Sequence, residues 1–151
     1  MHIPDKISKW IRAKNWTLHE HQIRMFKSSE CSSQLLIAPT GSGKTLAGFL
    51  PTIADLYLNP SQKLHTLYIS PLKALASDIK RNLETPIEEL ELKISVEDRT
   101  GDTKQSIKKK QRVIPPNILL TTPESLALLM SYPEAPSIFS SLKRIIAVSY
   151  T

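Results

Sequence analysis

The sequence contains a single cysteine, Cys31, among 151 residues. One cysteine excludes an internal disulfide and favours a reducing compartment. Long apolar runs are also missing, because the most apolar stretch, residues 46–58, is interrupted by Asp55 and is too short to cross a bilayer. The N-terminus shows no signal-peptide pattern, and the sequence has no repeats or low-complexity tracts. We therefore expect a soluble, cytoplasmic protein with no membrane partner.

The length and charge of the chain narrow the choice further. A chain of 151 residues is long enough to bury a core. Its 40% hydrophobic and 23% charged residues are ordinary for a globular protein. Twenty basic residues against fourteen acidic ones give a net charge of +6. This excess favours a polyanionic partner such as a nucleic acid or a nucleotide, although charge alone identifies neither.

Short apolar runs alternate with amphipathic segments along most of the chain. Strands are predicted in the segments QLLIAPT, LHTLYIS, LKISVED, NILLTT and RIIAV. Helices are predicted in KTLAGFLPTIADLYL, which Pro51 should bend or divide, and in PLKALASDIKRNL, TKQSIKKKQRV and PESLALLM. Residues 1–30 suit one or two short helices, and residues 31–151 form the main domain. The alternation predicts an α/β fold with a mostly parallel sheet flanked by helices.

The strongest motif is APTGSGKT, which fits the phosphate-loop pattern except that Ala38 replaces its first glycine. Gly41 and Gly43 allow backbone angles at which successive N–H groups converge on phosphate oxygens. Lys44 offers a point charge to the β- and γ-phosphates, and Thr45 offers a hydroxyl to Mg²⁺ at a helix start. The predicted nucleotide site comprises Ala38, Pro39, Thr40, Gly41, Ser42, Gly43, Lys44 and Thr45. Kinases, transporters, GTPases and helicases share such a loop.

Several segments in order are more specific than this loop. They are APTGSGKTLAGFLP, LHTLYISPLKALASDIKRNLETPIEEL, RTGDT and PPNILLTTPESLALLMSYPEAP. Together they resemble superfamily 2 DEXH-box DNA helicases, especially the large helicase-related (Lhr) group with its ligase-associated branch. The resemblance extends from about Trp10 to Ile146. It implies a P-loop NTPase fold of the RecA-like type, the use of ATP and Mg²⁺, and DNA or RNA as partner. It also implies work in DNA repair beside a DNA ligase or other repair proteins.

The resemblance assigns roles to residues outside the phosphate loop. Gln22 in HEHQ would contact the adenine base, which suits an amide because it donates and accepts together. Three further segments would hold the phosphate backbone of one nucleic-acid strand: Ser70, Pro71, Leu72 and Lys73; Thr100, Gly101 and Asp102; and Thr121, Thr122, Pro123, Glu124 and Ser125. The first and third follow predicted strands and open predicted helices, so N–H groups and hydroxyls should face a phosphate.

Two patterns allow both a functional and a structural interpretation. Five basic residues lie within nine positions: Lys104, Lys108, Lys109, Lys110 and Arg112. They form either a solvated helix face or a sequence-independent electrostatic contact with nucleic acid. His19 and His21 have the spacing of a metal pair, but no further ligands cluster near them in the sequence. A solvated or helix-capping role is therefore the preferred interpretation of the two histidines.

The last predicted strand lacks the residues that the resemblance implies at its end. In the helicases this strand ends in an Asp–Glu pair, which helps to hold Mg²⁺ and polarises the attacking water. Here Val148, Ser149 and Tyr150 occupy the corresponding positions, so no catalytic residue is assigned. We expect a truncated first motor domain, with a sheet incomplete at its C-terminal end and open apolar edges. Such a fragment should bind ATP and nucleic acid without efficient hydrolysis.

Two other functions are also considered. A non-enzymatic nucleic-acid-binding module would show a steep salt dependence of DNA binding that nucleotide does not change. A small P-loop kinase would transfer a phosphoryl group to a small acceptor. No acceptor-binding or lid segment is recognisable for the kinase, which is ranked last.

Overall fold

The computed structural model describes residues 2–30, 33–37 and 43–149. The chain forms two compact units, Met1–Asn59 and Pro60–Thr151. The predicted division after residue 30 is a different partition and remains a prediction. Within the described ranges, none of the helices combines the length and the apolar character that crossing a membrane requires.

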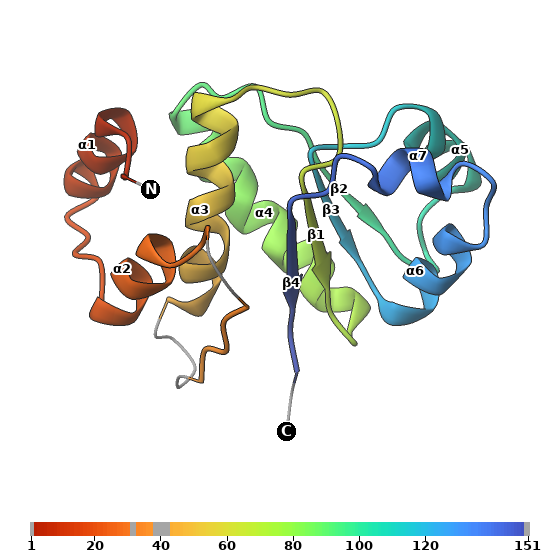
Figure 1. Cartoon of the computed structure of the whole chain (residues 1–151), viewed down its shortest axis with the longest axis horizontal. Coiled ribbons are helices and arrows are strands. Elements are labelled where there is room, and N and C mark those ends of the chain that lie inside the picture. The colour runs from red at the N-terminus through yellow and green to blue at the C-terminus, as the bar shows by residue number, and fades with distance from the viewer. Residues whose placement is uncertain (1, 31–32, 38–42, 150–151) are drawn as a thin grey trace. The chain divides into compact units, whose positions relative to one another are not determined.

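The N-terminal unit is helical, with α1 (Asp5–Ala13), α2 (Glu20–Lys27) and α3 (Lys44–Leu58) (Figure 1). Two short helices before residue 30 confirm that prediction. The helix α3 continues through Pro51 without a break, so the predicted division there is wrong. Its buried apolar residues explain why: Phe49, Leu50 and Ile53 are each at most 2% exposed. Burial of about 1.5–3 kcal/mol per such side chain outweighs a proline cost of about 3 kcal/mol.

The strand predicted around QLLIAPT does not form in its described part. Residues 33–37 lie outside any helix or strand, and both Leu35 and Ile37 are 86% exposed. A strand exists only when a neighbour accepts its backbone hydrogen bonds. No strand among the described residues pairs with this segment, so its apolar character alone does not order it as a strand.

The C-terminal unit contains a parallel sheet, which confirms the predicted α/β class. Its strands are β1 (Thr66–Ile69), β2 (Val96–Arg99), β3 (Ile118–Thr121) and β4 (Arg144–Ala147), in the order β2-β3-β1-β4. All three pairings are parallel, and the last residues of the four strands are in register. The strand β2 ends one residue beyond the predicted segment and starts four residues later. The four segments that follow the strands therefore all leave the sheet at the same end, where the strands have their carboxyl ends. We call this end the carboxyl edge.

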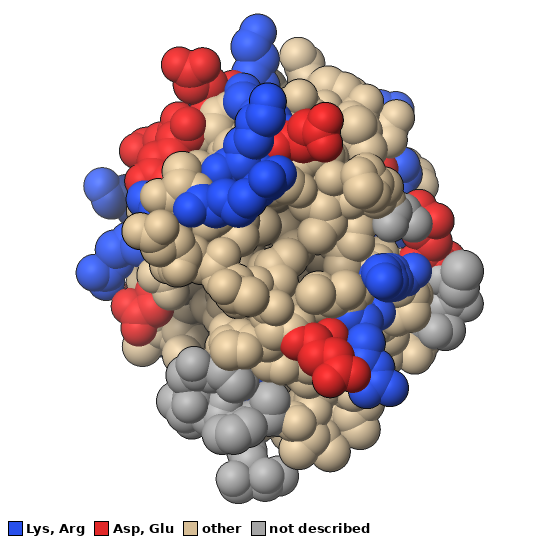
Figure 2. Space-filling model, turned by 90° about the vertical axis from the view of Figure 1, so that its left-hand side faces the viewer, with Lys and Arg blue, Asp and Glu red and all other residues tan. Residues whose placement is uncertain are grey.

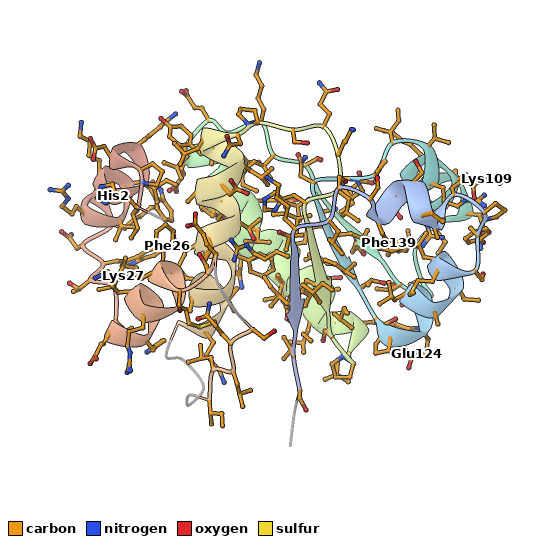
Figure 3. The ribbon with its side chains drawn as sticks, in the orientation of Figure 1. His2, Phe26, Lys27, Lys109, Glu124 and Phe139 are labelled. Atoms are coloured by element: carbon orange, nitrogen blue, oxygen red, sulfur yellow. The ribbon has the colours of Figure 1, made fainter. Side chains whose placement is uncertain are left out.

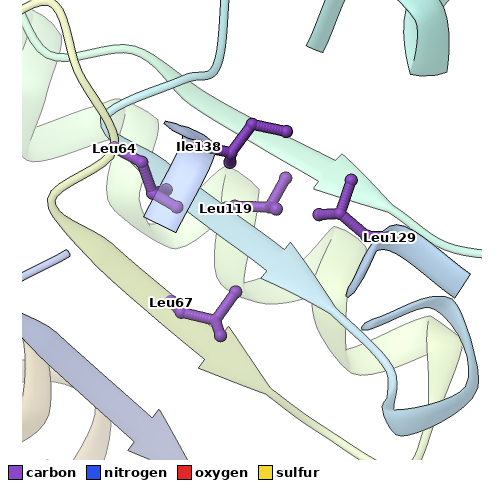
Figure 4. Packing of buried hydrophobic residues seen from close by; sticks show 5 residues of the cluster. All are labelled: Leu64, Leu67, Leu119, Leu129 and Ile138. Carbon is purple, nitrogen blue, oxygen red and sulfur yellow. The ribbon is translucent and has the colours of Figure 1, made fainter. Parts of the chain in front are cut away.

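Four helices connect these strands: α4 (Lys73–Glu89), α5 (Gln105–Val113), α6 (Pro123–Met130) and the short α7 (Ala135–Phe139), which the sequence pattern did not predict. Leu67 and Leu119 from the strands pack with Leu64, with Leu129 of α6 and with Ile138 of α7 (Figure 4). The helix α4 packs against β2 and β3. Since the alternate residues of β3 are also buried, the centre of the sheet is covered on both faces.

Asn117 joins the amino ends of the strands. Its side-chain oxygen accepts hydrogen bonds from the backbone N–H of Ser95 (3.0 Å) and from its hydroxyl (3.2 Å). Its amide nitrogen donates to the carbonyls of Ser61 (2.7 Å) and Lys63 (3.0 Å). Asn117 is 3% exposed, so nearly all its hydrogen-bonding capacity is used inside the protein. This residue holds the segments before β1 and β2 against β3.

The strand β4 pairs with β1 only, and none of the described residues bonds to its other edge. Its burial alternates weakly, and Ile145 is 61% exposed. A free edge with an apolar side chain beside it is a site for further strand pairing. Among the described residues, β4 therefore leaves one edge of the sheet without a pairing partner.

Candidate functional site

Gln22 links the start of α2 to the start of α3. Its Oε1 accepts a hydrogen bond from the backbone N–H of His19 (2.7 Å), and its Nε2 donates to the carbonyl of Gly43 (3.0 Å). The side chain is 3% exposed. Each amide atom keeps capacity for one more hydrogen bond. The adenine contact therefore remains a prediction, and the structure shows in addition that Gln22 connects two helix starts.

Gly43 precedes α3 with φ +76°, a left-handed conformation that side chains disfavour. A Cβ at this position would also collide with Nε2 of Gln22. We expect Gly43→Ala to lower the free energy of unfolding by about 2 kcal/mol, roughly half from the left-handed backbone and half from the displaced hydrogen bond. Thermal unfolding followed by circular dichroism measures this loss.

Gly101→Ala is the control for Gly43→Ala. Gly101 does not have a positive φ, and a Cβ there would meet only the end of the flexible Lys73 side chain, at 3.2 Å from Nζ. We expect this control to change stability by less than about 0.5 kcal/mol. Equal stability of the two variants would show that the Gln22–Gly43 contact does not constrain the backbone.

Only the end of the predicted phosphate loop is described. Ala38, Pro39, Thr40, Gly41 and Ser42 lie outside the described residues. Lys44 is the first residue of α3 and is exposed, and Thr45 follows it half-buried. Both lie in the first turn, where the helix dipole favours anions. This position agrees with a phosphate and Mg²⁺ site, which remains a prediction.

The two histidines before and within α2 lie side by side. Their rings stack with centroids 5.5 Å apart. His19 occupies the N-cap position of α2, in agreement with the capping role preferred from the sequence. Across the described ranges, no group of three or more potential ligands could hold a metal ion. The histidine pair thus gains no third ligand there.

The three predicted nucleic-acid segments lie together at the carboxyl edge of the sheet. They follow β1, β2 and β3, whose last residues Ile69, Arg99 and Thr121 are in register. The contacts continue past the strands, because the backbone N–H of Ser70 donates to the carbonyl of Thr121 (3.0 Å). Figure 3 shows Glu124 at this end of the unit, where α6 begins. Segments that are up to 55 positions apart in the sequence thus share one edge.

Local hydrogen bonds shape these segments. The Ser70 hydroxyl accepts from the backbone N–H of Leu72 (3.3 Å), and the Thr122 hydroxyl accepts from that of Ser125 (3.4 Å). Lys73 Nζ lies 3.4 Å from a carboxylate oxygen of Asp102, so this ion pair connects the start of α4 to the Thr-Gly-Asp turn. Both partners are exposed, which leaves the lysine available to another anion. An open cavity of about 380 Å³ lies beside them.

Arg99, the last residue of β2, was not singled out from the sequence. It is 3% exposed, and its Nη1 donates to the carbonyl of Lys108 (3.0 Å) and to Oε1 of Gln111 (3.2 Å). Burial lowers its pKa, and the charge of Arg112 lowers it further, whereas Tyr132 acts in the opposite direction. Little in the sequence pointed to this role, because Arg99 lies just after the predicted strand segment LKISVED.

The basic run forms α5 and its flanks, but its members differ. Lys104, Lys109 and Lys110 are exposed, Lys108 is half-buried, and the Arg112 guanidinium lies over the Tyr132 ring at 4.1 Å from its centroid. Figure 2 shows the left-hand side of the view in Figure 1, not the side where α5 is labelled, and there basic and acidic side chains lie interspersed while a broad central area carries neither. The net positive charge is therefore not gathered into a single patch on that face.

The end of β4 reaches the same edge as the nucleic-acid segments. The backbone N–H of Val148 donates to the carbonyl of Ile69 (3.0 Å), and Ser149 is exposed. Val148, Ser149, Tyr150 and Thr151 include no carboxylate. The position at which the Asp–Glu pair was expected thus lies at the edge of the sheet, and its described residues are apolar or neutral.

Comparisons with known proteins agree with this arrangement. The DEAD/DEAH box helicase family matches residues 19–147. The ATP-dependent helicase Lhr-Core protein 2 of Thermococcus barophilus is 36% identical over 95% of this chain and 18% of its own length. The ATP-dependent helicase Lhr-Core of Methanocaldococcus jannaschii is 38% identical over 93% of this chain and 18% of its own.

A solved structure is similar over the same region. The helicase Lhr of Mycobacterium smegmatis, bound to ssDNA and AMP-PNP, is 37% identical with a TM-score of 0.83 over 96% of this chain and 20% of that one. The chain spans about a fifth of the length of these three relatives. The resemblance to the Lhr group is thereby confirmed, while a DNA ligase or other repair partners remain predictions. With the family match over residues 19–147, the chain belongs to the DEAD/DEAH box helicase family.

Proposed function

We propose that the chain is the N-terminal ATP-binding portion of an Lhr-like, ATP-dependent DNA helicase. It binds ATP with Mg²⁺ at residues 38–45 and a single nucleic-acid strand along the carboxyl edge of its sheet. One observation carries this proposal: the last residues of β1, β2 and β3 are in register, so the three strands end side by side. This alignment brings the three predicted strand-binding segments onto one edge.

The chemistry of that edge suits a phosphate backbone. Parallel strands that lead into helices direct backbone N–H groups and hydroxyls outward at the helix starts, where anions are favoured. Lys73 adds a positive charge at the start of α4. Contacts of this kind position a strand without reading its sequence. The M. smegmatis relative, which is bound to ssDNA, supports DNA as the ligand.

The nucleotide site rests on the start of α3. Gly43 supplies the left-handed turn into the helix, Lys44 the charge, and Thr45 a hydroxyl for Mg²⁺. Bound Mg²⁺ would neutralise charge on the β- and γ-phosphates. The chain has no carboxylate after β4 to orient an attacking water. We therefore propose nucleotide binding with little hydrolysis by these 151 residues, a state in which the chain acts as a binding module.

Replacing Lys73 tests the nucleic-acid edge. We expect Lys73→Ala to weaken binding of a short single-stranded DNA about fivefold, because it removes one phosphate contact. The slope of log affinity against log salt should become shallower by about 0.7, the value for one phosphate on a single strand. Fluorescence anisotropy at several salt concentrations measures both quantities.

Lys93→Ala is the matched control for Lys73→Ala. Lys93 is exposed and precedes β2, so the same charge is removed at the opposite end of the strands. We expect its affinity and salt slope to match those of the unaltered chain. Equal losses of affinity in the two variants would mean that DNA binding depends only on the net charge of the chain, which would contradict a defined binding edge.

A further inference from the structure

A small cavity lies between the end of β2, α5 and α6. It measures about 80 Å³ and is lined by Arg99, Gln105, Lys108, Ser125, Leu128 and Tyr132. This volume suits a single small group and is far below the several hundred Å³ of pockets that take drug-sized ligands. Five of its six lining side chains carry a group that can donate a hydrogen bond, and none carries a carboxylate. The cavity therefore offers donors without a charged acceptor.

Arg99 contributes a buried positive charge to this cavity. Arginine is rarely buried without an anionic partner, because removing its charge from water is costly. Within the described part of the chain, no carboxylate forms an ion pair with Arg99. Among the described residues, the Arg99 guanidinium donates only to the backbone carbonyl of Lys108 and the side-chain amide oxygen of Gln111. The nearby Glu97 interacts with Gln111 instead, at 3.3 Å.

The neighbouring donors also have unused capacity. Ser125 is 6% exposed, and among the described residues its hydroxyl makes no hydrogen bond. Lys108 is half-buried and has no ion pair within the same ranges. Arg112 lies over the ring of Tyr132, which lines the cavity, and adds further positive charge nearby. A buried cation, a lysine and a free hydroxyl at the first turn of α6 thus converge on one small space.

We propose that this cavity binds a phosphate group, with Arg99, Lys108 and Ser125 as its donors. A tetrahedral oxyanion would supply the negative charge that Arg99 lacks, and its oxygens would accept from all three side chains. The group belongs either to inorganic phosphate or to a nucleic acid. The site shares Ser125 with the third proposed nucleic-acid segment but does not use Lys73, so the two proposals are tested through different lysines.

The test is a titration of the full chain with inorganic phosphate, followed by NMR through the backbone amides of Lys108, Ser125 and Leu128. Chloride at matched ionic strength controls for screening. We expect saturable shifts of these amides with phosphate and none with chloride. Lys108→Ala should weaken phosphate binding about fivefold. Lys109→Ala removes the same charge one position along, from an exposed site on α5, and should leave affinity within about twofold (Figure 3).

Further variants separate binding from folding. Arg99→Gln should abolish the saturable response, and if it fails to fold, Ser125→Ala still reports, with an expected loss of about threefold. Absence of saturation in the unaltered chain, equal shifts with chloride, or equal effects of Lys108→Ala and Lys109→Ala would overturn the proposal. Such a result with intact DNA binding at Lys73 would remove this site and leave the proposed function standing.

Competition identifies the source of the group. A short unphosphorylated oligonucleotide that displaces phosphate from these amides would assign the cavity to the backbone of a nucleic acid. Displacement by a 5′-phosphorylated oligonucleotide alone would assign it to a strand terminus. Phosphate binding that neither oligonucleotide displaces would assign the cavity to the free anion.

Discussion

Replacement of Lys44 by alanine is expected to lower the affinity for ATP by roughly 100-fold, equivalent to about 2.7 kcal/mol. Lys44 is the first residue of α3, where its charge and the helix dipole act on the same anion. A charge-assisted contact to phosphate is stronger than a neutral hydrogen bond, so its removal should dominate the binding energy. Equilibrium titration with a fluorescent ATP analogue in the presence of Mg²⁺ measures the loss.

Lys27→Ala is the control for Lys44→Ala. Lys27 is an exposed lysine at the end of α2 in the same compact unit, so the net charge changes equally. We expect its affinity for ATP to stay within about twofold of the unaltered chain. ATP turnover should be low in all three proteins. Rapid turnover that disappears with Lys44→Ala would contradict the proposal that these residues bind without hydrolysis.

Asn117→Ala is expected to destabilise the chain by about 3 kcal/mol. The substitution removes four side-chain hydrogen bonds to Ser95, Ser61 and Lys63. The N–H and hydroxyl of Ser95 and the carbonyls of Ser61 and Lys63 lose their partner at a buried position. Only some of these groups can recover a hydrogen bond from water. Urea denaturation followed by circular dichroism gives the change, and hydrogen exchange of β1 and β3 amides should accelerate accordingly.

Two variants test the cause of the Asn117 effect. Asn117→Asp keeps the acceptor toward Ser95 but loses both donors and sets a carboxylate against two carbonyls, so it should be about as destabilising. Asn59→Ala removes an exposed asparagine side chain that donates to Asp55 (2.9 Å) and should cost less than about 0.5 kcal/mol. A mild effect of Asn117→Ala would mean that water replaces the amide.

All elements of the C-terminal unit except α7 could be predicted, because their patterns are local. The run Ile118–Leu120 is apolar and, with Thr121, forms the buried β3, and the proline and glutamate shortly after it begin α6 as expected. The family's motifs then identified the loops at the strand ends. Parallel strands with helical crossovers bring such loops to one edge, so this part of the candidate site also followed from the pattern.

Other features depend on tertiary contacts that no local pattern carries. Whether residues 33–37 form a strand is decided by a pairing partner, and an apolar run does not specify one. The role of Arg99 depends on contacts from α5 and on burial near α6, which lie outside its own segment. Gln22 was assigned to the adenine, but its bond to Gly43 joins positions 21 apart and is visible only in the fold.

The two ends of β3 (Ile118–Thr121) differ in what a substitution there would change. At its amino end Asn117 holds three segments together. Substitutions there lower the amount of folded protein, and selection acts on that amount. At its carboxyl end the exposed Pro123 and Glu124 begin α6, so changes there alter the surface that meets a ligand while the register of the strands is retained. Natural drift and laboratory evolution could therefore alter which polyanion this edge accepts while the scaffold stays the same.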